Sequence, residues 1–313
     1  MLYILKKIGI FLLTLFVASL LVFFAFQVIP GDPATRMLGT NATPEKLAAL
    51  RDQLQLSDPV MVRYFRWLAG FVTGDLGISY GYNIPVSELI SGKLGITFAL
   101  TLLSFAMVVL ISIPMGIFLV RYAHSFLDRF FVIINQLVMS VPSFFIGIIF
   151  TYIFGQILHL FVVGNFVHSY EDPAGFWIYL FFAALAIALP KSAMVTKLLR
   201  TSMLKEMSED YVRTAFSRGN SRWQVLRKHV MRNAIIPVIT FLAVTLVDIL
   251  AGSIIIEQVF NIPGMGRLLV ESITKRDVPV AQAITMIIAV TVITVNYLAD
   301  VSYKYIDPRI RFR

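Results

Sequence analysis

The chain has 313 residues, of which 58% are hydrophobic and only 14% are charged, whereas a soluble globular protein carries roughly 25% charged residues. It contains no cysteine, which excludes disulfides and cysteine-ligated metal or iron–sulfur sites, and its four histidines show no metal-ligand spacing. The net charge of +9 could indicate nucleic-acid binding, but in so apolar a chain we expect it to reflect the basic cytoplasmic loops of a membrane protein that binds no nucleic acid.

Six apolar runs are long enough to cross a bilayer, whose ~30 Å hydrocarbon core requires about 20 helical residues. In chain order they are about Ile8–Ile29, Ile96–Val120, a tilted helix within Phe130–Leu160, a run from Phe176 past Pro190, Pro237–Ile256 and Val280–Ala299. The first run is longer than a signal-peptide core of roughly 7–15 residues, and no small-x-small cleavage motif follows it, so we expect a retained anchor. Pro190 removes a helix hydrogen bond, which predicts a kink in the fourth span.

The distribution of lysine and arginine predicts the orientation. Six spans place both termini on one side, and that side holds twice as many basic residues as the other, including the dense set from Lys191 to Arg232. Because loops rich in basic residues stay in the cytoplasm, we expect both termini to be cytoplasmic. The predicted parts are an N-terminal tail and first span (1–29), an extracytoplasmic segment (30–95), and a five-span core (96–313) with a cytoplasmic loop over 200–236.

The extracytoplasmic segment is expected to form a small cap of short helices. Turn signals occur at Pro30–Pro33 and at Gly74-Asp75, and an amphipathic stretch covers about Thr43–Leu54. The predicted fold is therefore all-α, with six transmembrane helices and an external helical cap between the first two.

No nucleotide-binding or catalytic motif is evident. Ser91-Gly92-Lys93 is the nearest match to a phosphate-binding loop, but Ser87 stands where that pattern requires glycine. An intramembrane enzyme would need paired carboxylates or histidines at membrane depth, which a lone aspartate at position 248 does not supply. We expect a chain that is not an enzyme and holds no cofactor, so if ATP drives it, another chain must bind the nucleotide.

Two short helical stretches are predicted within Met207–Thr240. The first begins at the acidic pair Glu209-Asp210, which suits a helix start. Its apolar face is formed at helical spacing by Val212, Ala215 and Phe216. Gly219 interrupts the helix because glycine permits positive φ. The second stretch sets apolar against basic side chains: Trp223, Leu226 and Val230 against Arg222, Arg227, Lys228 and Arg232.

A helix–glycine–helix in a cytoplasmic loop has two interpretations. It can present a rigid knob to a soluble partner, or it can lie as an amphipathic loop on anionic lipid. The residue pattern alone leaves both open.

This segment resembles the cytoplasmic coupling loop, called the EAA loop, of type I ABC importer permeases. It is most similar to the dipeptide/oligopeptide/nickel permease family, first-subunit type. The matching residues are Asp210-Tyr211-Val212-Arg213-Thr214-Ala215, Gly219, Lys228-His229, Arg232-Asn233-Ala234 and Pro237. Arg213 replaces the glutamate of the general pattern, as is usual in this family. Arg218 stands where the family most often has lysine, and Lys228 stands where it most often has arginine.

Short segments along the rest of the chain resemble the same family in the same order. They are Ile29–Pro33, Gly74–Ser79, Val141–Phe144, Glu257–Phe260 with Pro263–Gly266, Asp277-x-Pro279 and Asp307–Arg309. Each segment is a weak signal alone, but their order and spacing extend the resemblance from end to end. The part between Gly39 and Gly74 is the least typical.

The resemblance implies one permease half of an ATP-driven importer in a bacterial or archaeal cytoplasmic membrane. A second homologous permease would pair with it, two ATPase subunits holding ATP and Mg would dock on the cytoplasmic loops, and an extracytoplasmic binding protein would deliver the substrate. A peptide is the expected substrate, with nickel or a metal chelate as the alternative. The implied ATPase-coupling residues are Asp210, Tyr211, Val212, Arg213, Thr214, Ala215, Phe216 and Gly219.

Polar residues within the spans are candidates for the translocation path. Asp248, midway along the fifth span, either faces a water-filled path or pairs with a partner subunit, Thr245 or Ser253. Asn135, Gln136 and Ser140 either line the path or hydrogen-bond between helices, and the second is favoured. A self-sufficient secondary carrier is the rival function, but it should show inverted repeats or a charge relay, and neither is visible.

Overall fold

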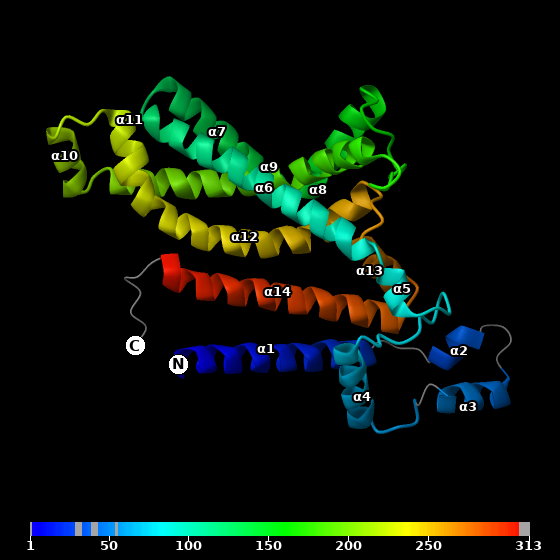
Figure 1. Cartoon of the computed structure of the whole chain (residues 1–313). Helices are drawn as coiled ribbons and strands as arrows, with labels where there is room; N and C mark the ends of the chain where they lie inside the picture. The colour runs from blue at the N-terminus through cyan, green and yellow to red at the C-terminus, as the bar shows by residue number, and fades with distance from the viewer. Residues whose placement is uncertain (1, 29–32, 39–42, 54–55, 307–313) are drawn as a thin grey trace. The chain divides into compact units, whose positions relative to one another are not determined.

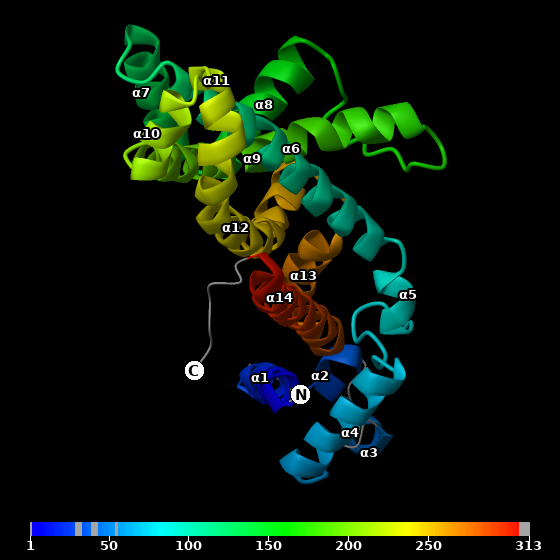
Figure 2. The same ribbon diagram turned by 60° about the vertical axis from the view of Figure 1, so that its left-hand side comes forward.

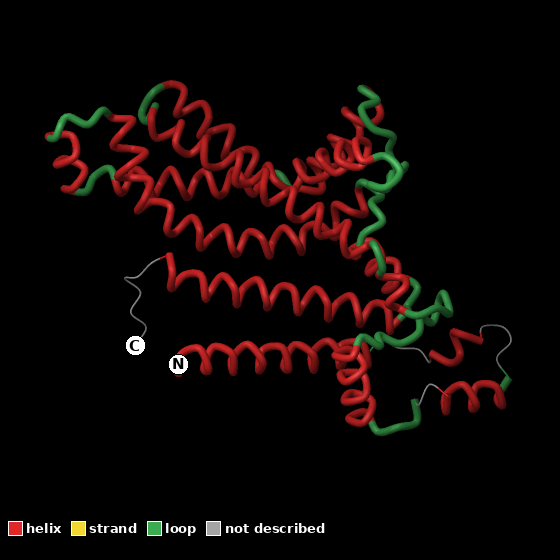
Figure 3. Tube along the Cα trace, viewed as in Figure 1, coloured by secondary structure: helices red, strands yellow, loops and turns green. Residues whose placement is uncertain are grey.

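The computed structural model describes residues 2–28, 33–38, 43–53 and 56–306, and the regular elements in these ranges are helices (Figure 3). One isolated β-bridge joins Ile78 and Pro85. The chain divides into two compact units, which are described separately. One unit runs up to Leu94 and includes Arg267–Tyr297, and the other comprises Gly95–Gly266 with the end of the last helix.

The first unit is built on α1 (Leu2–Gln27) and four short helices (Figure 1). These are α2 (Pro33–Leu38), α3 (Pro44–Gln53), α4 (Val60–Thr73) and α5 (Val86–Ile90). The predicted short helices are therefore present, and the turn at Gly74 is confirmed by its φ of 87°. The turn predicted at Pro30–Pro33 lies mostly outside the described residues. The hydroxyls of Ser19 and Tyr64 share a 2.8 Å hydrogen bond that ties α1 to α4.

A buried aspartate organises the rest of the first unit, which also holds most of α13 (Met265–Thr274) and most of α14 (Val278–Ile306). The Asp277 carboxylate accepts hydrogen bonds from the Ser79 hydroxyl and, at 3.0 Å each, from the backbone N–H groups of Tyr80 and Gly81. It thereby joins two segments that the sequence presents as separate motifs, almost 200 residues apart.

In the same unit, Glu271 accepts hydrogen bonds from Lys275 at 2.6 Å and from Tyr82 at 2.9 Å, and these bonds lower the pKa of its carboxyl.

The second unit consists of long helices packed around α9 (Pro173–Glu206), which contacts α7, α8 and α12 (Figures 1 and 2). Asp172 caps α9 by accepting from the Ala174 N–H at 3.0 Å, and Pro173 suits the first helical position, where no N–H partner is needed. The helix passes Pro190 and continues to Glu206, beyond the loop start expected at position 200. The other long helices are α6 (Lys93–Arg121) and α12 (Met231–Val259).

The third span is broken. The sequence predicts one tilted helix within Phe130–Leu160, but α7 (Phe126–Ser140) and α8 (Ser143–Phe150), which continues into the π-helical turn Thr151–Ile157, meet at an angle of 96°. The cause is Pro142, which disfavours the α conformation of the preceding residue, so Val141 is extended at φ −90° and ψ 126°.

Five described helices are long and apolar enough to cross a membrane, and the bent pair is the sixth if it counts as one span. They are Leu5–Gln27, Val86–Arg121, Pro173–Glu206, Arg222–Val259 and Val278–Val301. This agrees with the six spans predicted from the sequence.

Candidate functional site

The candidate coupling segment forms two short helices joined by a glycine turn. Helix α10 (Asp210–Ser217) ends before Gly219, which adopts φ 80°, as the predicted helix–glycine–helix requires. Helix α11 (Arg222–Val225) then starts with a capping box, in which Ser221 and Gln224 each accept from the other's backbone N–H. A π-helical turn, Leu226–Val230, carries the chain into α12. Both short helices lie at one end of α9 and α12 (Figure 1).

The sequence predicts one apolar face on α10, but its three residues differ in burial. Val212 and Ala215 are buried, and they belong to the same hydrophobic core as Leu226 and Val230. Phe216 is 40% exposed. The three residues of the predicted apolar face are therefore divided between the core of the chain and its surface, because helical spacing cannot distinguish packing within the chain from packing on a partner. The docking role of Phe216 stays a prediction.

The surface of α10 and its turn nevertheless includes most of the implied coupling residues. The exposed ones are Asp210, Tyr211, Arg213, Thr214, Phe216 and Gly219. A partner that docks on this surface would meet two aromatic side chains, Phe216 and Tyr211, among polar and charged groups.

Tyr211 connects α10 to both long helices that flank it. Its hydroxyl donates to the Glu206 carboxylate at the end of α9, at 2.6 Å, and accepts from the Asn233 amide in α12, at 3.1 Å. Partial burial and the bond to Glu206 raise the pKa of this hydroxyl, so it remains protonated at neutral pH. A displacement of α10 would therefore be transmitted to α9 and α12 together.

A buried ion pair, which the sequence analysis missed, fixes α7 against α9. The guanidinium of Arg200 donates to both oxygens of Asp128, at 3.0 and 2.8 Å, and the backbone N–H of His124 adds a third bond at 3.0 Å. Asp128 is only 3% exposed. The sequence did offer one signal for this helix start: Asp128 follows the possible N-cap Ser125 by three residues, at the edge of an apolar run.

Asp248 pairs with Lys191, which the sequence analysis counted among the basic residues of the cytoplasmic side. Its carboxylate lies 2.9 Å from the Lys191 ammonium, and both residues lie near the middle of their helices, α12 and α9. The suggested pairing with Thr245 or Ser253 is wrong, because those hydroxyls donate to carbonyls of their own helix, on Phe241 and Leu250. The Asp248 side chain remains 51% exposed.

The other path candidates make local and interhelical hydrogen bonds. The Asn135 amide donates to the Ala193 carbonyl at 2.8 Å, and the Gln136 side chain accepts from Lys197 at 3.3 Å. Ser140 donates to a carbonyl of its own helix. Asn135 and Gln136 thus join α7 to α9 beside a cavity of about 110 Å³, which favours the interhelical interpretation.

A second missed polar cluster lies at the far end of α12 from the coupling segment. The Thr97 hydroxyl donates to the fully buried carboxylate of Glu257 at 2.6 Å and accepts from the Met265 N–H at 2.9 Å. A Cβ at Gly264 would lie 2.4 Å from the same carboxylate, so a larger residue there would displace the carboxylate from Thr97. The cluster explains why Glu257 and the glycine-rich turn occur together in the sequence.

Known proteins match this sequence over almost the whole chain. Residues 112–312 match the family described as binding-protein-dependent transport system inner membrane component, and residues 1–101 match the N-terminal part of such proteins. A Brucella abortus protein named as a peptide transport system permease is 34% identical over 309 residues, covering 99% of this chain and 98% of its own. The glutathione transport system permease GsiC of Salmonella paratyphi A is 34% identical, with 99% of both chains covered.

A solved structure shares the fold. A chain of the MetNI methionine ABC transporter, in an inward-facing conformation, aligns with a TM-score of 0.58 at 16% identity, covering 70% of this chain and 96% of that one. Because the family profile covers well over half of the sequence, this chain is a member of the family of binding-protein-dependent transport system inner membrane components.

Proposed function

We propose that this chain is the transmembrane permease subunit of an ATP-driven ABC importer that takes up peptides. The observation that carries the proposal is α10, an exposed helix that Tyr211 ties to both α9 and α12. The names of the two relatives, a peptide permease and a glutathione permease, support a peptide as the substrate.

The proposed complex contains four further components. A second homologous permease completes the membrane part, two ATPase subunits bind ATP and Mg, and a binding protein delivers the peptide from outside. Closure of the ATPases displaces α10, and the Tyr211 bridge and the buried core around Val212 transmit the displacement to the long helices. Coupling also requires that the peptide bind the two states with different affinity.

We assign Asp248 to the translocation path at the junction with the second permease. A charged side chain at membrane depth is costly against lipid, so a half-exposed one faces water or protein. Asp248 lies within an exposed stripe of α12. The other members of the stripe are Pro237, Thr240, Val244, Ala251, Ile255 and Gln258.

The proposed orientation predicts a labelling pattern. The chain has no cysteine, so one cysteine introduced by Ser57→Cys or Ser217→Cys would be its only thiol. An impermeant thiol reagent added to spheroplasts should label Ser57→Cys and should label Ser217→Cys only after the membrane is broken. The reverse pattern would contradict the orientation.

ATP hydrolysis in reconstituted complexes tests the function. The chain alone should hydrolyse no ATP, because its sequence lacks a phosphate-binding loop. Together with the companion permease and the two ATPases, it should give hydrolysis that peptide-loaded binding protein stimulates. Hydrolysis by the chain alone, or a complex indifferent to the binding protein, would refute the proposal.

A further inference from the structure

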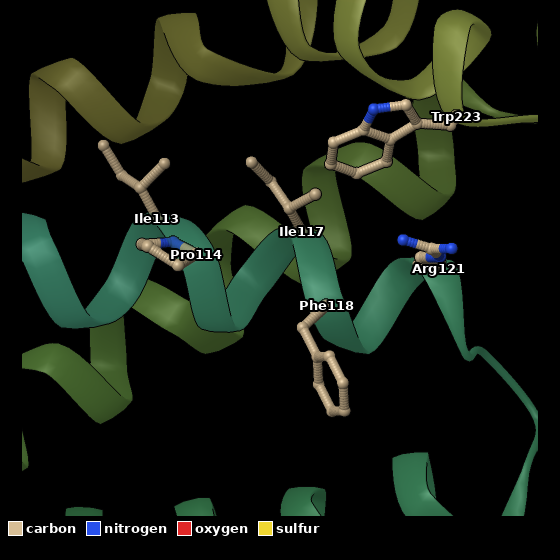
Figure 4. A pocket seen from close by; sticks show the side chains of 6 residues that line it. All are labelled: Ile113, Pro114, Ile117, Phe118, Arg121 and Trp223. Atoms are coloured by element: carbon tan, nitrogen blue, oxygen red, sulfur yellow. The ribbon is translucent and has the colours of Figure 1, made fainter.

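A cavity lies between the C-terminal end of α6 and α11. It has a volume of about 300 Å³, at the lower end of the ~300–1,000 Å³ range of small-molecule pockets. Its walls are Ile113, Pro114, Ile117, Phe118, Arg121 and Trp223. Ile113 and Ile117 point to the same side of α6 as Trp223 of α11, and Arg121 lies below the indole (Figure 4).

The pocket separates apolar from cationic groups along its length. From Ile113 to Arg121 the helix advances by about 12 Å at 1.5 Å per residue, and the residues of α6 that line this length are apolar until the arginine. A ligand that fits both ends has a hydrocarbon part several carbons long and an anionic head.

One guanidinium group, that of Arg121, lines the cationic end of the pocket, and a second, that of Arg222, contacts the same end of α6. Arg121 lies over the rings of Tyr122 and Trp223, at 5.6 and 5.4 Å from their centroids. Arg222 donates to the carbonyl of Val120 at 3.5 Å, which holds it at the same end of α6. Within the described part of the chain, no carboxylate forms an ion pair with either arginine.

The position of the pocket selects a membrane amphiphile over a soluble one. Helix α6 is part of the candidate span Val86–Arg121, so Arg121 marks the end of a span. Tryptophan favours the membrane–water interface, where its ring meets hydrocarbon and its N–H meets water, and Trp223 is 43% exposed beside that end.

We propose that the pocket binds one anionic phospholipid. An acyl chain lies along Ile113, Pro114 and Ile117, and the phosphate lies between the guanidinium groups of Arg121 and Arg222. The site is independent of the proposed transport function. In the proposed orientation, this end of α6 lies at the cytoplasmic leaflet.

Fluorescence quenching by brominated lipid tests the site. The chain has three tryptophans, so Trp67→Phe with Trp177→Phe leaves Trp223 as the only one. The full-length protein is placed in phosphatidylcholine bilayers that contain a minor fraction of phosphatidylglycerol or phosphatidylcholine brominated near the headgroup. Phosphatidylglycerol should occupy the site with an affinity at least about five-fold higher, since each basic residue near an anionic lipid contributes ~1 kcal/mol.

The variants separate a site from general surface charge. Arg121→Gln and Arg222→Gln should each lower the preference for phosphatidylglycerol about five-fold. Arg227→Gln, in the π-helical turn that follows α11, should leave it unchanged. Ile117→Phe, which fills the cavity, should reduce quenching by both lipids.

Three results would overturn the proposal. One is equal quenching of Trp223 by the two lipids in the protein without arginine substitutions. Another is a preference for phosphatidylglycerol that survives both arginine substitutions. The third is protection of Trp223 from both lipids once the companion permease is bound, which would place protein in the pocket.

Discussion

Gly219→Val should reduce ATP-driven uptake to less than about a tenth of the wild-type rate, while Gly219→Asn should retain most of it. Gly219 adopts φ 80°, and a Cβ there would meet no atom within 4 Å, so the effect is one of backbone conformation and not of space. The left-handed region costs an L-residue ~1–2 kcal/mol, and a β-branched residue is a clear outlier there, whereas asparagine enters it more readily. The valine variant therefore redirects the chain between α10 and α11.

Phe216→Ala should weaken capture of the ATPases by the permease pair. A central aromatic anchor contributes ~2 kcal/mol or more to an interface, which corresponds to a roughly 30-fold loss of affinity. Phe126→Ala, at an exposed phenylalanine outside the segment, is the matched control and should bind normally. Membrane insertion and pairing with the second permease should be unchanged in all variants.

The outcome distinguishes a docking knob from a loop that rests on lipid. In the lipid interpretation, neutralising Arg222 and Arg227 would matter more than truncating Phe216, and capture of the ATPases would be unaffected. If Gly219→Val and Phe216→Ala both retain full ATPase binding and normal uptake, α10 is not the coupling element.

Asp248→Ala should impair both assembly and uptake, because it leaves the Lys191 ammonium without its partner at membrane depth. Breaking a fully buried ion pair costs ~3–5 kcal/mol. Here the side chains are 25% and 51% exposed, so solvent screening makes the cost smaller. Assembly is measured as the yield of the complete complex in size-exclusion chromatography, beside uptake.

The exchange Lys191→Asp with Asp248→Lys distinguishes two roles of the pair. A purely structural pair should regain both assembly and uptake. A pair that lines the path, as proposed, should regain assembly but not uptake, because the order of charges along the path is inverted. If Asp248→Ala alone changes neither quantity, the pair has no role in the complex.

Local features of the coupling segment could be predicted from the sequence. Acidic residues at a helix start, apolar residues at helical spacing and a glycine between two stretches each depend on a few neighbouring residues. The structure reproduces them as α10, Gly219 and α11. Spacing could not show that Ala215 packs inward while Phe216 remains exposed, because that depends on what covers each side of the helix.

Long-range partners could not be predicted. The partners are far apart in the sequence: 57 residues for Lys191 and Asp248, 160 for Thr97 and Glu257, and 198 for Ser79 and Asp277. In each pair, the residues around one partner do not indicate the other. The break in the third span, by contrast, could have been predicted from the sequence. Val141 precedes Pro142, and a residue before proline prefers an extended backbone, so the sequence carries a local signal for the break.

Peptide uptake into proteoliposomes tests the central claim most directly. Vesicles contain the chain, the companion permease and both ATPases, with ATP on the ATPase side and peptide-loaded binding protein on the other. The account predicts that labelled peptide accumulates only when all four subunits, ATP and binding protein are present, and that Gly219→Val abolishes accumulation. Accumulation by the chain alone, driven by an ion gradient and indifferent to ATP, would contradict the account and indicate a secondary carrier.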